Sequence, residues 1–145
     1  MREIGRQAFS GRRCDKVVFP STLKYISDGA FSDCGYLKLL TFPNGLQSIG
    51  QYAFDACIEL TSVVMTDTVT EIHKSAFRGC DGLRSVQLSK GLKFIGMDSF
   101  RRCRSLSSLT IHEGIEEIEA DAFTNTGLRT LVIPSSLKKL EKNLL

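Results

Sequence analysis

The stretch Ile72-His73-Lys74-Ser75-Ala76-Phe77-Arg78-Gly79-Cys80-Asp81-Gly82-Leu83-Arg84-Ser85-Val86-Gln87-Leu88-Ser89-Lys90-Gly91-Leu92-Lys93-Phe94 is one unit of a repeat that fills the chain. Its opening isoleucine recurs every 23 residues, at Ile26, Ile49, Ile72, Ile95 and Ile118. Self-similarity at a fixed period of this length is typical of repeat architectures, in which each unit packs only on its neighbours. The repeat therefore decides the fold class.

Further apolar slots recur in phase with the isoleucine. A small residue and a phenylalanine follow it, then cysteine in four units, then leucine, two strand-like apolar positions and a closing aliphatic residue. The phenylalanines are Phe31, Phe54, Phe77, Phe100 and Phe123, and the cysteines are Cys34, Cys57, Cys80 and Cys103. The first and last units, which begin at Ile4 and Ile118, are one residue shorter and lack the cysteine.

Each unit predicts two extended segments and one tight turn. In residues 83–88, Val86 and Leu88 alternate with polar residues, which is the periodicity of a strand. Residues 92–95 form a second short extended segment. The piece from Ala76 to Cys80 is too short for a stable α-helix, so we expect a single helical or 3₁₀ turn. We predict a leucine-rich-repeat-like solenoid with parallel strands on one face, and with these turns and extended segments on the other.

We expect residues 1–145 to form one solenoid of about six coils of 22–23 residues, with repeats starting near residues 4, 26, 49, 72, 95 and 118. One unit buries too few apolar side chains, at about 2 kcal/mol each, to offset about 1 kcal/mol of backbone entropy per residue. Stacking supplies the missing burial. Both ends of the sequence interrupt a repeat, so we expect the chain to be a fragment of a longer array.

Composition narrows the classes of function. The net charge is +3, and no aromatic residues interleave with basic ones, so there is no strong nucleic-acid signal. No apolar run is long enough to span a membrane, and no signal peptide precedes the first repeat. His73 and His112 stand alone, no metal-ligand spacing occurs, and no cofactor motif is present. We expect the cysteines to be reduced and buried as small apolar residues.

The derived pattern, Ile-Gly-x-x-Ala-Phe-x-x-Cys-x-x-Leu followed by a strand and proline, resembles the BspA-like (bacterial surface protein A type) leucine-rich repeat. Residues 49–57 match it closely, and so do residues 26–43. Departures are local: His73 and Glu119 replace the glycine, and Ser89 and His112 replace the proline. The resemblance implies a non-enzymatic solenoid that binds proteins or other macromolecules, often in adhesion, and a secreted or cell-surface location.

Two surfaces are candidate binding sites. Side chains that alternate with the core positions of the strands form outward rows across the coils. The predicted binding face comprises Leu39, Thr41, Ser62, Val64, Arg84, Ser85, Gln87, Ser108, Thr110, Arg129, Thr130 and Val132. A second surface, the predicted basic edge, comprises Arg78, Arg101, Arg102 and Arg104. Either surface is also consistent with solvated polar residues that bind nothing.

Three functional readings follow. The favoured one is a macromolecule-binding module that uses the strand face. The alternative is a structural spacer within a longer surface protein, with the binding site elsewhere. An enzyme is not expected, because no serine, histidine and acid occupy related positions. The segment from Leu137 to Leu145 has the apolar spacing of a short amphipathic helix, which either caps the solenoid or begins a further repeat. The N-terminal end carries no evident cap, which favours end-to-end self-association.

Overall fold

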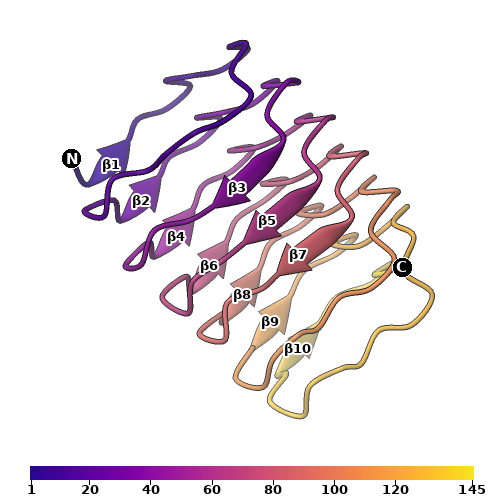
Figure 1. Cartoon of the computed structure of the whole chain (residues 1–145). Coiled ribbons are helices and arrows are strands. Elements are labelled where there is room, and N and C mark those ends of the chain that lie inside the picture. Colours follow the sequence, from indigo (N-terminus) through magenta and orange to yellow (C-terminus); the bar gives the residue numbers. More distant parts are fainter.

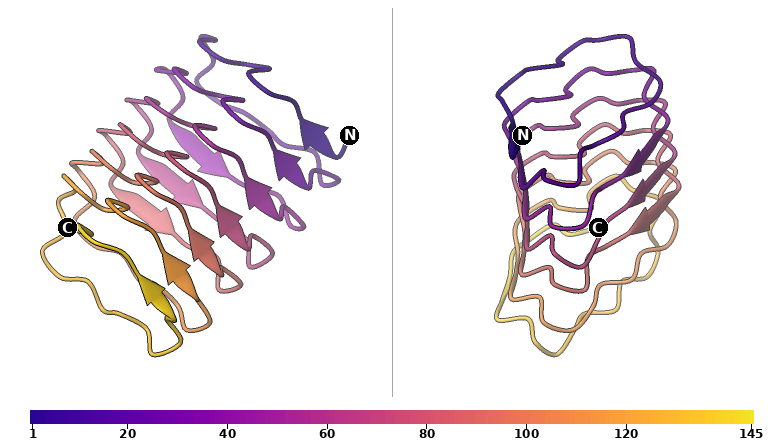
Figure 2. Two further views of the ribbon diagram at one scale, coloured as in Figure 1. Left: turned by 180° about the vertical axis from the view of Figure 1, so that it is seen from behind. Right: turned by 60° about the vertical axis from the view of Figure 1, so that its left-hand side comes forward.

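The computed structural model describes all residues from 1 to 145 as a stack of parallel coils with a strand at two places in the coil (Figure 1). The predicted solenoid is confirmed. Strands occupy two opposite faces of the coils, not one (Figure 2, right). The second extended segment of each unit, residues 92–95 in the quoted repeat, thus forms a sheet of its own.

The first sheet is seven-stranded and runs the whole length of the stack. Its strands are β1 (Glu3–Ile4), β2 (Tyr25–Ile26), β4 (Ser48–Ile49), β6 (Glu71–Ile72), β8 (Phe94–Ile95), β9 (Glu117–Ile118) and β10 (Lys139–Leu140). Every pair is parallel and in register, with isoleucine opposite isoleucine from β1 to β9. These isoleucines point into the core and are buried, while the preceding residue of each strand faces outward.

The second sheet is three-stranded and occupies only the middle of the stack. It contains β3 (Leu39–Thr41), β5 (Ser62–Val64) and β7 (Ser85–Gln87) in that order. Before it, a single bridge joins Lys16 to Leu39. After it, the predicted strands of the last two coils, at residues 106–111 and 129–133, are not strands. The predicted continuous strand face is therefore interrupted.

The predicted helical or 3₁₀ turns do not form, and this expectation was wrong. Two positions in every coil, two residues before and two residues after the phenylalanine, have positive φ, as at Tyr52 (φ 55°) and Ala56 (φ 58°). A chain that alternates hand in this way cannot continue a right-handed helix. Alternate amides instead bond to the next coil, as Phe54 N–H does to the Ala76 carbonyl at 2.8 Å. The turns thus build a third ladder along the stack.

Two columns of side chains fill the core beside these turns. Six phenylalanine rings from Phe9 to Phe123 stack nearly parallel, with centroids 5.1–5.8 Å apart. The four repeated cysteines are buried, as predicted, and all five cysteines are free thiols. Each buried thiol also donates a hydrogen bond to a phenylalanine carbonyl of the preceding coil, for example Cys80 Sγ to Phe54 O at 3.2 Å.

The C-terminal segment is not the amphipathic helix that its apolar spacing predicted. Lys139 and Leu140 form β10, which pairs with β9. Further on, the Asp121 amide bonds to the Lys142 carbonyl at 3.2 Å and the Phe123 amide to the Leu144 carbonyl at 3.1 Å. The segment thus starts another coil, which was the second of the two readings. Stacking on the coil below satisfies these backbone groups, whereas an isolated helix of nine residues is marginal.

Candidate binding surface

The predicted binding face lies over the three-stranded sheet and its continuation into the last two coils. Ten of its twelve residues are exposed, and only Ser62 and Val64 are half-buried. The inward neighbours Leu40 and Val63 are fully buried, so the alternation deduced from the sequence holds on β3 and β5. The structure brings residues from adjacent coils side by side through the ladder, as with Thr41, Val64 and Gln87.

The polar side chains of this face make no hydrogen bond or ion pair within the protein. The hydroxyls concerned belong to Thr41, Ser62, Ser85, Ser108, Thr110 and Thr130, and the other groups are the Gln87 amide and the Arg84 and Arg129 guanidinium groups. Several outward side chains of the seven-stranded sheet instead bond to side chains on or beside a strand of the same sheet. Tyr25 donates to Gln47 at 3.3 Å, and the Lys139 ammonium lies 3.2 Å from Glu117. The polar side chains of the predicted face therefore have no partner within the protein, in contrast to those of the seven-stranded sheet.

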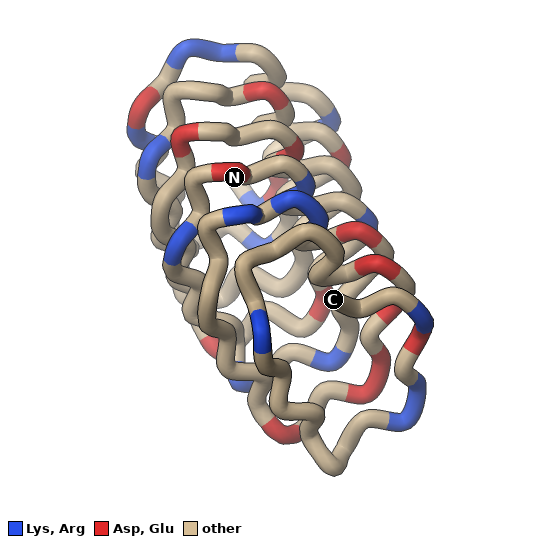
Figure 3. The backbone as a smooth tube through the Cα atoms, turned by 90° about the vertical axis from the view of Figure 1, so that its right-hand side faces the viewer, with Lys and Arg blue, Asp and Glu red and all other residues tan.

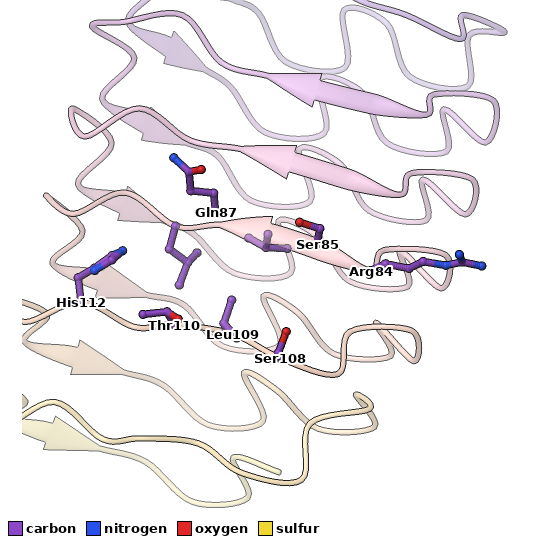
Figure 4. A pocket seen from close by; sticks show the side chains of 9 residues that line it. Arg84, Ser85, Gln87, Ser108, Leu109, Thr110 and His112 are labelled. Carbon is purple, nitrogen blue, oxygen red and sulfur yellow. The ribbon is translucent and has the colours of Figure 1, made fainter.

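Three hollows interrupt this face where the strand ladder is incomplete. One of about 600 Å³ lies between the first two coils and is lined by Val18, Leu39 and Phe42 among others. One of about 390 Å³ lies between β7 and residues 108–112 (Figure 4). The third, of about 580 Å³, separates residues 107–109 from residues 127–132. The face is thus a ridged surface with openings between coils.

The predicted basic edge is largely neutralised. Arg78 forms a bidentate pair with Asp55, at 2.9 and 3.0 Å, and this hydrogen bonding raises the pKa of Arg78. Arg101 lies 3.1 Å from Asp98, and Arg104 lies 3.2 Å from Asp81. The pairs of Arg78 and Arg104 join neighbouring coils, whereas Arg101 and Asp98 lie in the same turn. Figure 3 shows basic and acidic residues interspersed along the coils. Arg102 alone of the four has no acidic partner, which weakens this edge as a site for an acidic ligand.

Other chemistry-bearing groups are dispersed. His73 pairs with Glu71 at 3.0 Å on the outer side of the seven-stranded sheet, and His112 lies beside the hollow next to β7. No group of three or more His, Cys, Asp or Glu side chains is arranged to hold a metal ion. No helix has the length and apolar character needed to cross a bilayer. Burial raises the pKa of the Cys34 thiol to about 12, so this group is a poor nucleophile.

Sequence reasoning missed the interruption of the ladder after β7. The strand slots of the fifth coil, with Leu109 and Ile111, match those of the fourth, with Val86 and Leu88. No residue in these slots marks the break. The hollow beside β7 and the exposure of its backbone edge therefore came only from the structure.

The architecture is that of a parallel β-solenoid built from leucine-rich repeats. A family model for the BspA type leucine-rich repeat region matches six copies over residues 2–125. The chain belongs to this family, as the resemblance in its repeat slots predicted. Members of this repeat family are typically non-enzymatic and are binding or structural modules.

Solved structures of bacterial repeat proteins are similar to this chain. A leucine-rich cell surface protein from Faecalibacterium prausnitzii is 28% identical with a TM-score of 0.70, over 94% of this chain and 46% of that one. The leucine-rich repeat protein of T. pallidum is 27% identical with a TM-score of 0.72, over 81% and 56%. One from Eubacterium ventriosum, 23% identical with a TM-score of 0.75 over 90% and 42%, shows the fold alone. No curated protein matches.

This chain thus spans roughly half the length of the solved relatives it resembles.

Proposed function

We propose that residues 1–145 act as a single non-enzymatic module that binds a protein or other macromolecule through the predicted binding face over the three-stranded sheet. The observation that carries the proposal is the contrast between the two outer surfaces. The predicted binding face leaves its hydroxyls, its Gln87 amide and two guanidinium groups without partners. On the seven-stranded sheet, Glu3, Tyr25 and Glu117 each have a side-chain partner on or beside a neighbouring strand. Unpaired polar groups on a rigid, repeated surface are what a macromolecular partner needs for specific contacts.

Adhesion at a cell surface is the setting we propose for this binding. The F. prausnitzii relative is described as a cell surface protein, and another relative, PcpA, as a pneumococcal vaccine antigen. A spacer without binding activity is the competing function.

The experiment compares the native chain with two charge-bearing double variants. Ser85→Glu with Ser108→Glu puts two carboxylates on the strand face. Gln47→Glu with Thr70→Glu puts two carboxylates on exposed positions just before β4 and β6. These positions lie between Lys24 and Lys93 in the same row of the stack. Each immobilised protein is incubated with an extract of cell-surface material, and the macromolecule that it retains is identified. The affinity of that macromolecule for each of the three proteins is then measured by interferometry. Circular dichroism checks that all three proteins are folded.

We expect the native chain and the second double variant to bind equally, and the first to bind at least about tenfold more weakly. Equal binding by all three would place the partner elsewhere, and the basic edge around Arg102 would be the next surface to test. A chain that captures nothing would favour the spacer.

A further inference from the structure

The strand ladder stops at one edge of β7. In the coils before it, the Phe42 amide donates to the Val64 carbonyl at 3.1 Å, and the Met65 amide donates to the Gln87 carbonyl at 3.0 Å. Leu88 occupies the same slot one coil later, and its amide has no such partner on Thr110. No backbone hydrogen bond joins residues 84–88 to residues 106–112.

The segment that should continue the sheet is equally free. Residues 107–112 make no backbone hydrogen bond with the β7 coil on one side or with residues 129–133 on the other. The seven-stranded sheet and the turn ladder remain bonded between the same two coils, as Gly96 N–H to Ile72 O at 2.8 Å and Phe77 N–H to Ser99 O at 2.8 Å show. The coils are therefore joined on two sides and open on the third.

The opening reaches the core. Val86 is only half-buried, although Leu40 and Val63 in the same slot of the preceding coils are fully buried. Leu109, across the gap, is also half-buried. The hollow of about 390 Å³ between them is lined by Ser85 and Gln87 on one side and by Ser108 and Thr110 on the other (Figure 4).

We infer that this opening accepts an extended peptide segment of a partner protein, which adds to the edge of β7 as a further strand. The inference deepens the proposed function, on which it rests, by naming the chemical form of the ligand. An exposed strand edge with unpaired amides and carbonyls is a template for another strand, and strand addition is a general mode of peptide recognition.

The lining defines the peptide. An inward side chain lies between Val86 and Leu109, so it is apolar and β-branched. Outward side chains lie beside the hydroxyls of Ser85 and Ser108, so they are small and polar. Arg84 stands at one end of the opening without an ion pair, and no Asp or Glu lines the hollow. Charge complementarity therefore calls for an acidic residue at the end of the peptide that lies beside Arg84.

The test uses the whole chain and a synthetic heptapeptide, Glu-Thr-Val-Thr-Val-Thr-Glu with blocked ends, which presents an acid to Arg84 in either direction. Amide resonances and hydrogen exchange are followed by NMR as the peptide is added. We expect the Val86 and Leu88 amides to shift and to exchange more slowly. The same peptide with alternate amides N-methylated loses the donors that face β7, and is expected to bind at least about tenfold more weakly.

A charge exchange tests the contact with Arg84. Arg84→Glu is expected to weaken binding of the acidic peptide about threefold, and a peptide with lysine at both ends restores binding to this variant. Arg12→Glu, at an exposed arginine of the first coil that belongs to neither candidate surface, is the matched control and is expected to leave binding unchanged.

Four results would overturn the inference. The first is equal protection of the Leu88 and Met65 amides from hydrogen exchange in the free protein, and the second is equal affinity for the N-methylated and the unmodified peptide. The third is no shift of the amide resonances up to about 5 mM peptide. The fourth is that concentrating the protein alone produces the same amide changes, which would make a second copy of the chain the occupant. A partner that binds the native chain but not the Ser85→Glu and Ser108→Glu variant, and leaves the Leu88 amide unchanged, would retain the proposed function and refute this inference.

Discussion

The two sheets of this solenoid are built from the same repeat yet differ in completeness. The seven-stranded sheet pairs every coil with the next, and so does the turn ladder beside the phenylalanine column. The three-stranded sheet pairs only the coils of β3, β5 and β7. Two closed sides hold the coils together, so the third side can open without loss of the stack. The difference shows that regular sequence slots do not guarantee regular pairing.

The largest expected effect is on stability, at one repeat slot that is fully buried in β5 and half-buried at the open edge of β7. Val63→Ala removes two methyl groups from a fully buried site in the middle strand, and should lower the free energy of unfolding by about 2–3 kcal/mol. Val86→Ala makes the same change at the half-buried open edge, and should lower it by about 1 kcal/mol. Urea denaturation measures both. Equal losses would mean that the edge is closed in solution.

The thiol column gives the next effect, on the closed side of the molecule. The pKa of Cys57 is raised by the neighbouring Cys80 thiol and by burial, and burial raises that of Cys80. Since the folded state keeps these thiols protonated while the unfolded chain loses protons above its pKa of about 8.5, stability is present below that pH and is lost as pH rises. For each such thiol, the free energy of unfolding falls by about 2 kcal/mol between pH 8 and pH 10.

The check is a pair of urea titrations at pH 8 and pH 10. Cys57→Ala should lose about 2 kcal/mol less than the native chain between these pH values, whatever its stability at pH 8. Ser107→Ala, which removes an exposed hydroxyl and no titratable group, should follow the native pH dependence. Identical slopes for the native chain and Cys57→Ala would show that the column is reached by solvent.

A smaller effect concerns the buried hydroxyl of the turn ladder. The slot of Ser99 is alanine in the other five units, at Ala8, Ala30, Ala53, Ala76 and Ala122. The Oγ of Ser99 is buried without a hydrogen-bond partner. Ser99→Ala should therefore raise the free energy of unfolding by about 1 kcal/mol. Thermal denaturation checks this, with Ser107→Ala on the exposed surface as a control near zero. A destabilised Ser99→Ala protein would mean that water or another group satisfies the hydroxyl.

The smallest effect tests the positive φ values of the turn ladder in adjacent coils. Ala56 has φ 58° and Gly79, in the same slot, has φ 72°. Only glycine adopts this region without steric cost. Ala56→Gly should stabilise by about 0.5 kcal/mol, and Gly79→Ala should destabilise by a similar or slightly larger amount. Chemical denaturation should give changes of opposite sign in the free energy of unfolding for the two variants. Changes of the same sign would contradict the positive φ at this slot.

Most of the core was predictable because its burial depends on side-chain type at a fixed period. Ile72, Phe77, Cys80 and Leu83 lie where the pattern placed them, and all are fully buried. The turns were not predictable, since the pattern carried no signal for Tyr52 or Ala56 at positive φ. The candidate face was found by alternation, but its openings and its lack of internal hydrogen bonds depend on contacts between coils, which no single repeat encodes.

The sequence by itself determined the solenoid, its period, its core columns and the rows that face outward, because these follow from which side chains leave water. The tertiary structure alone decided that there are two sheets, that the basic edge is neutralised by Asp55, Asp81 and Asp98, and that the ladder opens after β7. The physical reason is that backbone pairing depends on the distance and orientation of whole coils. The distance and orientation of the coils are set by the sum of contacts along the stack, and the residues of any one coil do not determine them.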